Sequence, residues 1–358
     1  MIARKPISIL LLLVIACLPL LGAASSTAKE SPEGKEEFDL KELAMEHVMD
    51  AHEWHLADYN GHSISIPLPI ILWDNGLKVF MSSEFEHGHK VVQKGDSYYK
   101  IYHEKIYKTN AEGELQMDEA GHPINEKPLD FSITKNVASM LLASLLIFLL
   151  FTAAARSYKK SSVPGGISGF LEPLVVFVRD DIAKPNIGED KYKKFLPYLL
   201  TVFFFIWMNN LFGLLPIPPG GGANVTGNIA VTLVLSVFTM LITNISANKA
   251  YWQHIFWMPG VPIPIRFLLA PIELIGVISK PFALMIRLFA NITAGHIIIL
   301  CLTALIFVFK SLLVAPVSIL FVLFMSCIEL LVALLQAYIF TLLSALFIGL
   351  AVKEDEHH

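Results

Sequence analysis

Five ionisable side chains lie inside two long apolar segments of this sequence, residues 267–309 and 311–352. No other Asp, Glu, Lys, Arg or His occurs in these segments, and the five are Glu273, Lys280, Arg287, His296 and Glu329. A charged side chain at the centre of a bilayer costs at least about 2.5 kcal/mol on insertion scales, so such residues usually have a function. One of them alone could be a structural ion pair between helices, but five together favour a path for ions.

The spacing places titratable groups on both sides of Arg287 along a helix. Glu273 precedes Arg287 by 14 residues, which is about 21 Å of helix and within about 40° of the same face. Asn291 follows one turn later on that face. His296 lies roughly 13 Å beyond Arg287 and about 180° around the helix.

The second segment can supply partners to the first. Glu329 and Gln336 are seven residues apart and therefore share one helix face. If the two helices pack together, Glu329 could meet His296, and Gln336 could meet Arg287.

The residue types fit proton transfer. Histidine and glutamate change protonation when partly buried, whereas arginine keeps its charge because its pKa stays above about 12. A fixed positive charge between two titratable clusters stops protons from passing straight through. It also attracts a carboxylate carried by a partner that moves.

The composition indicates that a membrane protein positions these residues. The 358 residues are 54% hydrophobic and 16% charged, with a mean hydropathy of +0.59, which argues against a soluble enzyme. Of 31 acidic residues, 21 lie between Glu30 and Asp130. No basic run suggests nucleic acid. The three cysteines lie far apart in apolar runs and predict neither a disulfide framework nor a zinc site.

Hydropathy predicts about five membrane helices. Residues 137–155, 195–215 and 229–247 are each long enough to span a bilayer, and residues 165–184 read as an amphipathic interfacial helix. As helices, the two long segments would each measure about 63 Å against a hydrocarbon core of about 30 Å, so each must break into two spans or tilt steeply.

The N-terminus predicts export. Residues 1–25 read as a signal peptide cut near Ala23 to Ser25, although residues 14–17 also resemble a lipoprotein cleavage site at Cys17. Residues 26–132 would then lie outside the cytoplasm. Arg156, Lys159 and Lys160 after the first span mark the cytoplasmic side, which agrees with that orientation.

The exported region is predicted to be a small α+β unit. Residues 36–59 have apolar positions at helical spacing, residues 63–83 read as two strands around Asp74-Asn75-Gly76, and residues 97–109 are a further strand candidate. His47, His52 and His55 could bind a metal, but their spacing fits no strong motif, and solvated surface histidines are the favoured interpretation. We predict no metal and no cofactor.

Several motifs resemble subunit a of the F-type ATP synthase, the membrane stator that conducts protons to the rotating c-ring. The stretch "IELIGVISKPFALMIRLFANITAGH" is similar to the family's Lys-Pro … Arg-Leu-Phe-x-Asn-x-x-Ala-Gly pattern. "LLQAYIFTLL" resembles its Gln-Ala-aromatic-Ile-Phe motif, and "NNLFGLLP" and "ANVT" resemble its earlier helices. The resemblance runs from about Asp130 to the C-terminus and does not cover the acidic N-terminal region.

The resemblance implies a role for each site residue. Arg287 resembles the essential arginine that faces the c-ring carboxylate, with Asn291 and Gln336 as its polar neighbours. His296 and Glu329 occupy the positions of a histidine–acid pair in the half-channel open to the outside. Glu273 resembles the acid near the cytoplasmic exit, Asn210 resembles a polar residue of the inlet, and Gly213 stands where some members have an aspartate.

The resemblance also implies the architecture. An all-α polytopic membrane domain, residues 133–352, would hold the last two helices strongly tilted, with residues 353–358 as a cytoplasmic tail in a bacterial inner membrane. Its partners would be the c-ring, subunit b, the rest of the ATP synthase, lipid and protons. The chain lacks a phosphate-binding loop and is not expected to bind nucleotide. Sodium in place of protons, the ring size and the direction of the reaction stay open.

Two other functions are alternatives to a stator subunit. A stand-alone ion channel or transporter would use the same buried charges without a ring, but it predicts internal repeats, and the sequence has no clear repeat. A membrane-anchored binding protein would use its helices as anchors, which leaves the five intramembrane ionisable residues unexplained.

Overall fold

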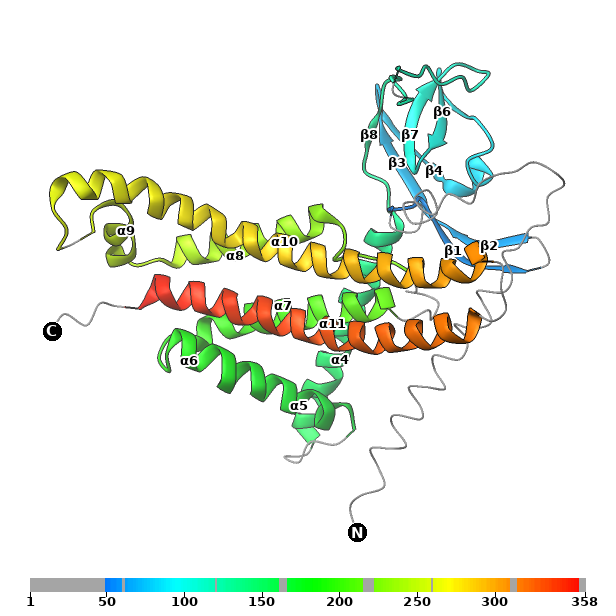
Figure 1. Cartoon of the computed structure of the whole chain (residues 1–358). Helices are drawn as coiled ribbons and strands as arrows, with labels where there is room; N and C mark the ends of the chain where they lie inside the picture. The colour runs from blue at the N-terminus through cyan, green and yellow to red at the C-terminus, as the bar shows by residue number, and fades with distance from the viewer. Residues whose placement is uncertain are drawn as a thin grey trace, which may run out of the picture. The chain divides into compact units, whose positions relative to one another are not determined.

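The computed structural model describes residues 49–59, 62–119, 121–160, 166–214, 222–258, 260–309 and 314–353. The chain divides into two compact units, Met1–Ala138 with Pro216–Gly221, and Ser139–Leu215 with Gly222–His358 (Figure 1). The predicted signal peptide, the alternative cleavage site at Cys17 and most of the helix predicted at residues 36–59 lie outside the described residues.

Short antiparallel strands build the described part of the first unit. β1 (Glu53–Tyr59) pairs with β2 (His62–Pro67). A second sheet has the order β4 (Leu77–Met81), β3 (Pro69–Trp73), β8 (Leu129–Asp130). A third has the order β5 (Val92–Lys94), β6 (Ser97–Tyr102), β7 (Lys105–Thr109), and the short 3₁₀ helix η1 (Ser82–Phe85) follows β4. Buried apolar side chains from the second and third sheets and η1, including Ile70, Leu72, Phe85 and Tyr99, form its core.

The predicted hairpin at Asp74-Asn75-Gly76 is confirmed. Trp73 pairs with Leu77 across the turn, and Asn75 and Gly76 have φ of 50° and 135°. Positive φ is accessible to glycine and tolerated by asparagine, which explains why this dipeptide closes the turn.

Two predictions for this unit are wrong in detail. Residues 53–59 form strand β1 rather than the end of a helix, because their backbone groups pair with β2. The single strand expected at residues 97–109 is a hairpin of β6 and β7. His103 and Glu104 turn it with φ of 45° and 58°, a conformation that the alternating pattern of the flanking residues did not reveal.

A buried carboxylate stabilises the core of the first unit. Asp74 is 9% exposed and accepts hydrogen bonds from Tyr99 Oη at 2.6 Å, Lys108 Nζ at 2.8 Å and Ser97 Oγ at 3.2 Å. The hydrogen bond from Lys108, and then that from Tyr99, lower the pKa of Asp74 from 3.8 to about 2. The network ties the β3–β4 turn to β6 and β7.

We expect Asp74→Asn to lower the stability of this unit by about 1–3 kcal/mol, because Lys108 loses its buried charge partner. The folded pKa lies below the unfolded one, so the stabilisation by Asp74 is complete above about pH 4 and is lost as the pH falls toward 2. Hydrogen exchange of the β3 and β6 amides in the full-length protein measures the loss. Glu126→Gln is the matched control, since Glu126 contacts the same lysine but its side chain is 76% exposed. Equal effects of both substitutions would contradict the prediction.

Helices build the second unit. The first, α4 (Lys135–Lys160), begins at the end of the first unit. Then follow α5 (Ile167–Phe177), the π-helical turn η2 (Val178–Ala183), α6 (Lys184–Ile187) and α7 (Tyr192–Leu214). The chain continues through α8 (Ile229–Ser246), α9 (Lys249–Phe256), α10 (Ile263–Phe309) and α11 (Ala315–Val352).

Five of the described helices, α4, α7, α8, α10 and α11, are long and apolar enough to cross a membrane. The chain is therefore a mostly helical, polytopic membrane protein, as predicted. Each long apolar segment is one continuous helix, of 47 residues in α10 and 38 in α11, so the alternative of a break into two spans is excluded. Helix α9 lies between the predicted span at residues 229–247 and the long apolar segment 267–309, in a stretch for which the sequence analysis predicts no helix. The Asn248 side chain caps it by accepting a hydrogen bond from Tyr251 N at 2.8 Å.

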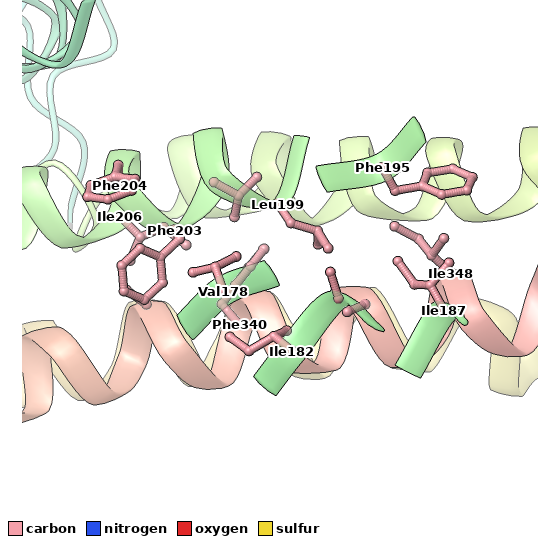
Figure 2. Packing of buried hydrophobic residues seen from close by; sticks show 14 of the residues in the cluster. Val178, Ile182, Ile187, Phe195, Leu199, Phe203, Phe204, Ile206, Phe340 and Ile348 are labelled. Atoms are coloured by element: carbon pink, nitrogen blue, oxygen red, sulfur yellow. The ribbon is translucent and has the colours of Figure 1, made fainter. Parts of the chain in front are cut away.

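The core of the second unit lies between α7, η2, α6 and α11. Figure 2 shows Phe203 and Leu199 of α7 opposite Val178 and Ile182 of η2 and Phe340 of α11. At Gly349 of α11, an added Cβ would overlap the Asn186 carbonyl oxygen, so glycine permits α11 to contact α6 this closely. The rigid contact fixes the rotation of α11, and hence the direction of its polar side chains.

Candidate functional site

Arg287 lies on the exposed surface of α10. Its neighbours Leu284 and Leu288 are 2% and 0% exposed and belong to the core, while Arg287 itself is exposed. Among the described residues, none forms a hydrogen bond or an ion pair with its guanidinium group. A permanent charge in a candidate membrane span, with no such partner among the described residues, favours a counter-charge from another molecule.

Asn291 and Gln336 connect α10 to α11 one turn beyond Arg287. The two helices run side by side (Figure 1), and Asn291 Nδ2 donates to Gln336 Oε1 at 3.0 Å. Gln336 is only 2% exposed. The amide pair fixes the register of the two helices where Arg287 lies. The spacing in the sequence allows Gln336 to meet Arg287, but among the described residues the hydrogen-bond partner of Gln336 is Asn291.

Glu329 lies in a tight contact between α11 and α10. It is 5% exposed, and its carboxylate packs so closely on Gly295 that an added Cβ there would overlap it. Glu329 Oε2 has no hydrogen-bond partner among the described residues. Gly295, which directly precedes His296 in the sequence, has no side chain and so leaves room for the Glu329 carboxylate.

His296 points toward α7. It is half-buried, and its Nε2 atom lies 3.5 Å from the position that a Cβ on Gly213 would occupy. Helices α7, α10 and α11 thus bring Gly213, His296 and the Gly295–Glu329 contact into one region. The imidazole thus lies beside Gly213, the position where some members of the family that the sequence resembles have an aspartate.

Asn210 is a buried polar link near this region. It is 2% exposed, accepts a hydrogen bond from Thr226 Oγ1 at 2.5 Å, and donates to the Ala333 carbonyl at 3.4 Å. Because Ala333 lies one turn after Glu329 on α11, Asn210 connects α7 and the segment before α8 to the part of α11 that carries the acid.

Glu273 and Lys280 lie on the part of α10 that precedes Arg287, near α8 and α9. A cavity of about 20 Å³, lined by residues that include Thr243, Tyr251 and Lys280, has room for about one water molecule. Burial and then the charge of Glu273 raise the pKa of Tyr251. Lys280 therefore lines this small cavity, and Glu273 acts electrostatically on Tyr251, another residue of the lining.

The sequence analysis missed the polar surface of α8. Four buried hydroxyl residues share one face of this helix, Thr232, Ser236, Thr239 and Thr243. Their spacing of four, three and four residues is the signal that could have revealed it. Thr239 links two other helices, since its Oγ1 lies 2.7 Å from Tyr198 Oη and 3.4 Å from Ser344 Oγ.

The predicted histidine cluster is only partly described. His47 lies outside the described residues, and nothing is described of the side chain of His55. His52 is 4% exposed, and its Nε2 lies 2.9 Å from Asp130 Oδ2. Among the described residues, no group of three or more His, Cys, Asp or Glu side chains is arranged to hold a metal ion.

Comparisons with known proteins agree with the division of the chain into an N-terminal unit of strands and a unit of helices. Residues 137–349 match the family "ATP synthase A chain". Residues 43–131 match a separate family described as a domain of unknown function (DUF8433).

Similar curated proteins match the helical part of the chain. "ATP synthase subunit a 2" of Chlorobaculum tepidum is 52% identical over 238 residues, which cover 64% of this chain and 66% of that protein. "ATP synthase subunit a" of Chloroherpeton thalassium is 48% identical, covering 64% of this chain and 69% of its own length. The protein named "ATP synthase subunit a" from Anaeromyxobacter sp. is 43% identical, covering 71% of this chain and 64% of its own length. The chain thus spans about two thirds of the length of these relatives.

Proposed function

Since the chain belongs to the ATP synthase A chain family, we propose that it is the proton-translocating stator subunit of the ATP synthase membrane sector. In this role it is not an enzyme by itself and binds no nucleotide. It delivers protons to a ring of small membrane subunits and receives them back, and rotation of that ring drives ATP synthesis elsewhere in the complex.

The observation that carries this proposal is the unpaired, exposed guanidinium of Arg287. Within the described chain no carboxylate neutralises it, which supports a carboxylate of the ring as its partner. A ring carboxylate that arrives protonated loses its proton near Arg287, because a nearby positive charge favours the ionised form. Arg287 itself cannot carry a proton onward, so it separates the two halves of the path.

The half-channel open to the outside would use Glu329, His296 and Asn210. The buried Glu329 carboxylate beside Gly295 and the neighbouring imidazole of His296 are two groups that can gain and lose protons. Asn210 and Thr226 offer a polar approach to the same region. Protons would enter here and neutralise the ring carboxylate before it moves into lipid.

The half-channel open to the cytoplasm would use Glu273. Tyr251, whose pKa the charge of Glu273 raises, lines a small cavity together with Thr243 and Lys280. Asn291 and Gln336 hold α10 against α11 and keep the two half-channels at a fixed offset. A proton that moves between them through about 100 mV releases roughly 2.3 kcal/mol, so several per turn supply the work.

The proposed location follows from the charges. Residues 1–25 act as a signal peptide, residues 26–132 lie outside the cytoplasm, residues 133–352 form the membrane domain, and residues 353–358 end in the cytoplasm of a bacterial cell. The cations Arg156 and Lys159 at the end of α4 support this orientation in the inner membrane.

Purification in a mild detergent tests the stator against a stand-alone channel. We expect a small ring-forming membrane subunit and subunit b to co-purify with the chain. We expect the same assembly with Arg287→Ala, since Arg287 is exposed and forms no hydrogen bond or ion pair among the described residues. A chain that purifies alone and conducts protons in vesicles would contradict the proposal.

A further inference from the structure

One face of the sheet β4–β3–β8 in the first unit is apolar and exposed. Successive side chains of a strand point to opposite faces of the sheet, and one set, which includes Ile70 and Leu72, enters the core. The opposite set is between 41% and 64% exposed although its members are large and apolar, and it consists of Trp73, Leu77, Val79, Met81, Leu129 and Phe131. We call these six residues the apolar face. Contiguous exposed apolar surface is rare on a protein and marks a site of interaction.

Strand pairing makes the apolar face continuous. The strands β4, β3 and β8 lie side by side (Figure 1), and residues directly opposite each other in antiparallel strands point to the same face. Trp73 lies opposite both Leu77 and Leu129. Phe131 N donates to the Ile71 carbonyl at 2.8 Å, so the pairing continues past the end of β8. The apolar face therefore measures about 10 Å from β4 to β8 and about 17 Å along β4.

The chain enters this unit beside the apolar face. Thr134 Oγ1 donates to Asp50 Oδ2 at 2.8 Å, and Asn136 N donates to Asp50 Oδ1 at 3.0 Å. Thr134 follows Phe131 by three residues, which span at most about 11 Å. The segment that precedes Asp50 therefore begins within reach of one end of the apolar face.

The sequence before Asp50 has the pattern of a helix that matches this surface. Residues 36–48 lie outside the described residues. Four of their apolar positions fall within about 140° of one helix face, namely Leu40, Leu43, Ala44 and Val48. As a helix the segment would be about 20 Å long, close to the length of the apolar face. The match to a separate family begins at residue 43, so residues 43–48 belong to the same recurring unit as the strands.

Covalent attachment favours this segment over a separate partner. A segment tethered next to its site binds in an intramolecular step, with an effective concentration in the millimolar range for a short tether. A helix packed on a sheet removes the apolar surfaces of both from water.

We propose that residues 36–48 form an amphipathic helix that packs on the apolar face of the β4–β3–β8 sheet. The docked helix completes the N-terminal unit and closes the apolar face to other chains and to lipid. This packing does not involve the proton path, so it holds whether or not the proposed function does.

Photo-cross-linking from the apolar face identifies what covers it. Val79→benzoylphenylalanine is introduced into the full-length chain, the assembled complex is illuminated, and the cross-linked peptides are mapped by mass spectrometry. We expect cross-links to residues 36–48. Complexes made from a mixture of isotope-labelled and unlabelled chains show whether those residues come from the same chain. Cross-links to lipid, to a second copy or to another subunit in their place would overturn the proposal, as would the absence of any cross-link to residues 36–48.

A second position controls for chance encounters with the segment. Gln93 is exposed, and it follows Val92, whose side chain lies in the core. Alternation along the strand therefore points Gln93 away from the core, on the outer side of the third sheet. Gln93→benzoylphenylalanine should give no cross-link to residues 36–48. Equal cross-linking from positions 79 and 93 would mean that the segment has no fixed site, contrary to the proposal.

Matched substitutions in the segment test how it docks. Leu40→Ser with Leu43→Ser should lower the yield of the cross-link from position 79 by about tenfold or more, because apolar contacts are lost. Glu42→Ser with Glu46→Ser introduces the same residue on the opposite side of the helix, at a similar cost in helix propensity, and should leave the yield unchanged. Equal yields from the two pairs would contradict docking through the apolar positions.

Discussion

Arg287→Ala abolishes proton-driven ATP synthesis in membrane vesicles, according to the proposed function. The substitution removes the fixed positive charge that makes a ring carboxylate release its proton and that keeps the two half-channels apart. ATP synthesis after an imposed pH and potential difference measures the loss, and we expect activity at the background level. Proton leakage through the membrane sector should rise in the same vesicles.

Two further substitutions make this result specific. Arg266 lies on the same helix, but its Nε donates to the Val261 carbonyl at 2.6 Å and its guanidinium lies 4.9 Å from the Trp257 ring centre, so Arg266→Ala should leave synthesis largely intact. Arg287→Lys keeps a charge that can be lost, because a lysine pKa falls in apolar surroundings, and we expect little rescue. Full ATP synthesis by an intact complex with Arg287→Ala would refute the proposal that Arg287 separates the two half-channels.

Glu329→Gln should slow proton uptake by about 100-fold, the lower end of what a positioned proton-transfer group contributes to a rate. Glutamine has nearly the same shape as glutamate, so the close packing on Gly295 is kept while the group that titrates is lost. The rate of proton flow through the membrane sector, followed with a pH-sensitive dye from pH 6 to 9, measures the effect. His296→Ala is expected to slow the same step without disassembling the complex.

The close packing of Glu329 on Gly295 gives an independent check of the role of Glu329. Gly295→Ala leaves every ionisable group in place but puts a Cβ where the Glu329 carboxylate lies, so it should also slow proton uptake. Glu189→Gln changes an exposed carboxylate of the same unit and should have no effect. Normal uptake by Glu329→Gln would remove this acid from the proposed path.

The sequence by itself determined the membrane architecture and the positions of the polar residues along it. Hydropathy and helical spacing are local properties, since each depends on residues within one segment. The five spans, the hairpin at Asp74-Asn75-Gly76 and the placement of Arg287 and Asn291 on one face of α10 all follow from such patterns. Family motifs added the expected roles, which the experiments above test.

Local patterns failed where pairing or capping between segments decided the structure. Residues 53–59 fall in the helix predicted at residues 36–59 but form β1, because β2 offers backbone partners that a pattern within one segment cannot reveal. Helix α9 follows no pattern used in the sequence analysis, and in the structure the Asn248 side chain caps its first turn. These errors concern elements whose stability comes from neighbouring residues rather than from their own periodicity.

Only the tertiary structure decided which polar groups meet. The pairing of Gln336 with Asn291 rather than Arg287, the seating of Glu329 on Gly295 and the direction of His296 toward Gly213 depend on how far α10, α11 and α7 are rotated and shifted against one another. A rotation of one residue turns a helix face by about 100°. That rotation is set by close contacts such as Gly349 against Asn186, and no single helix encodes it, because it is a property of the packed interface.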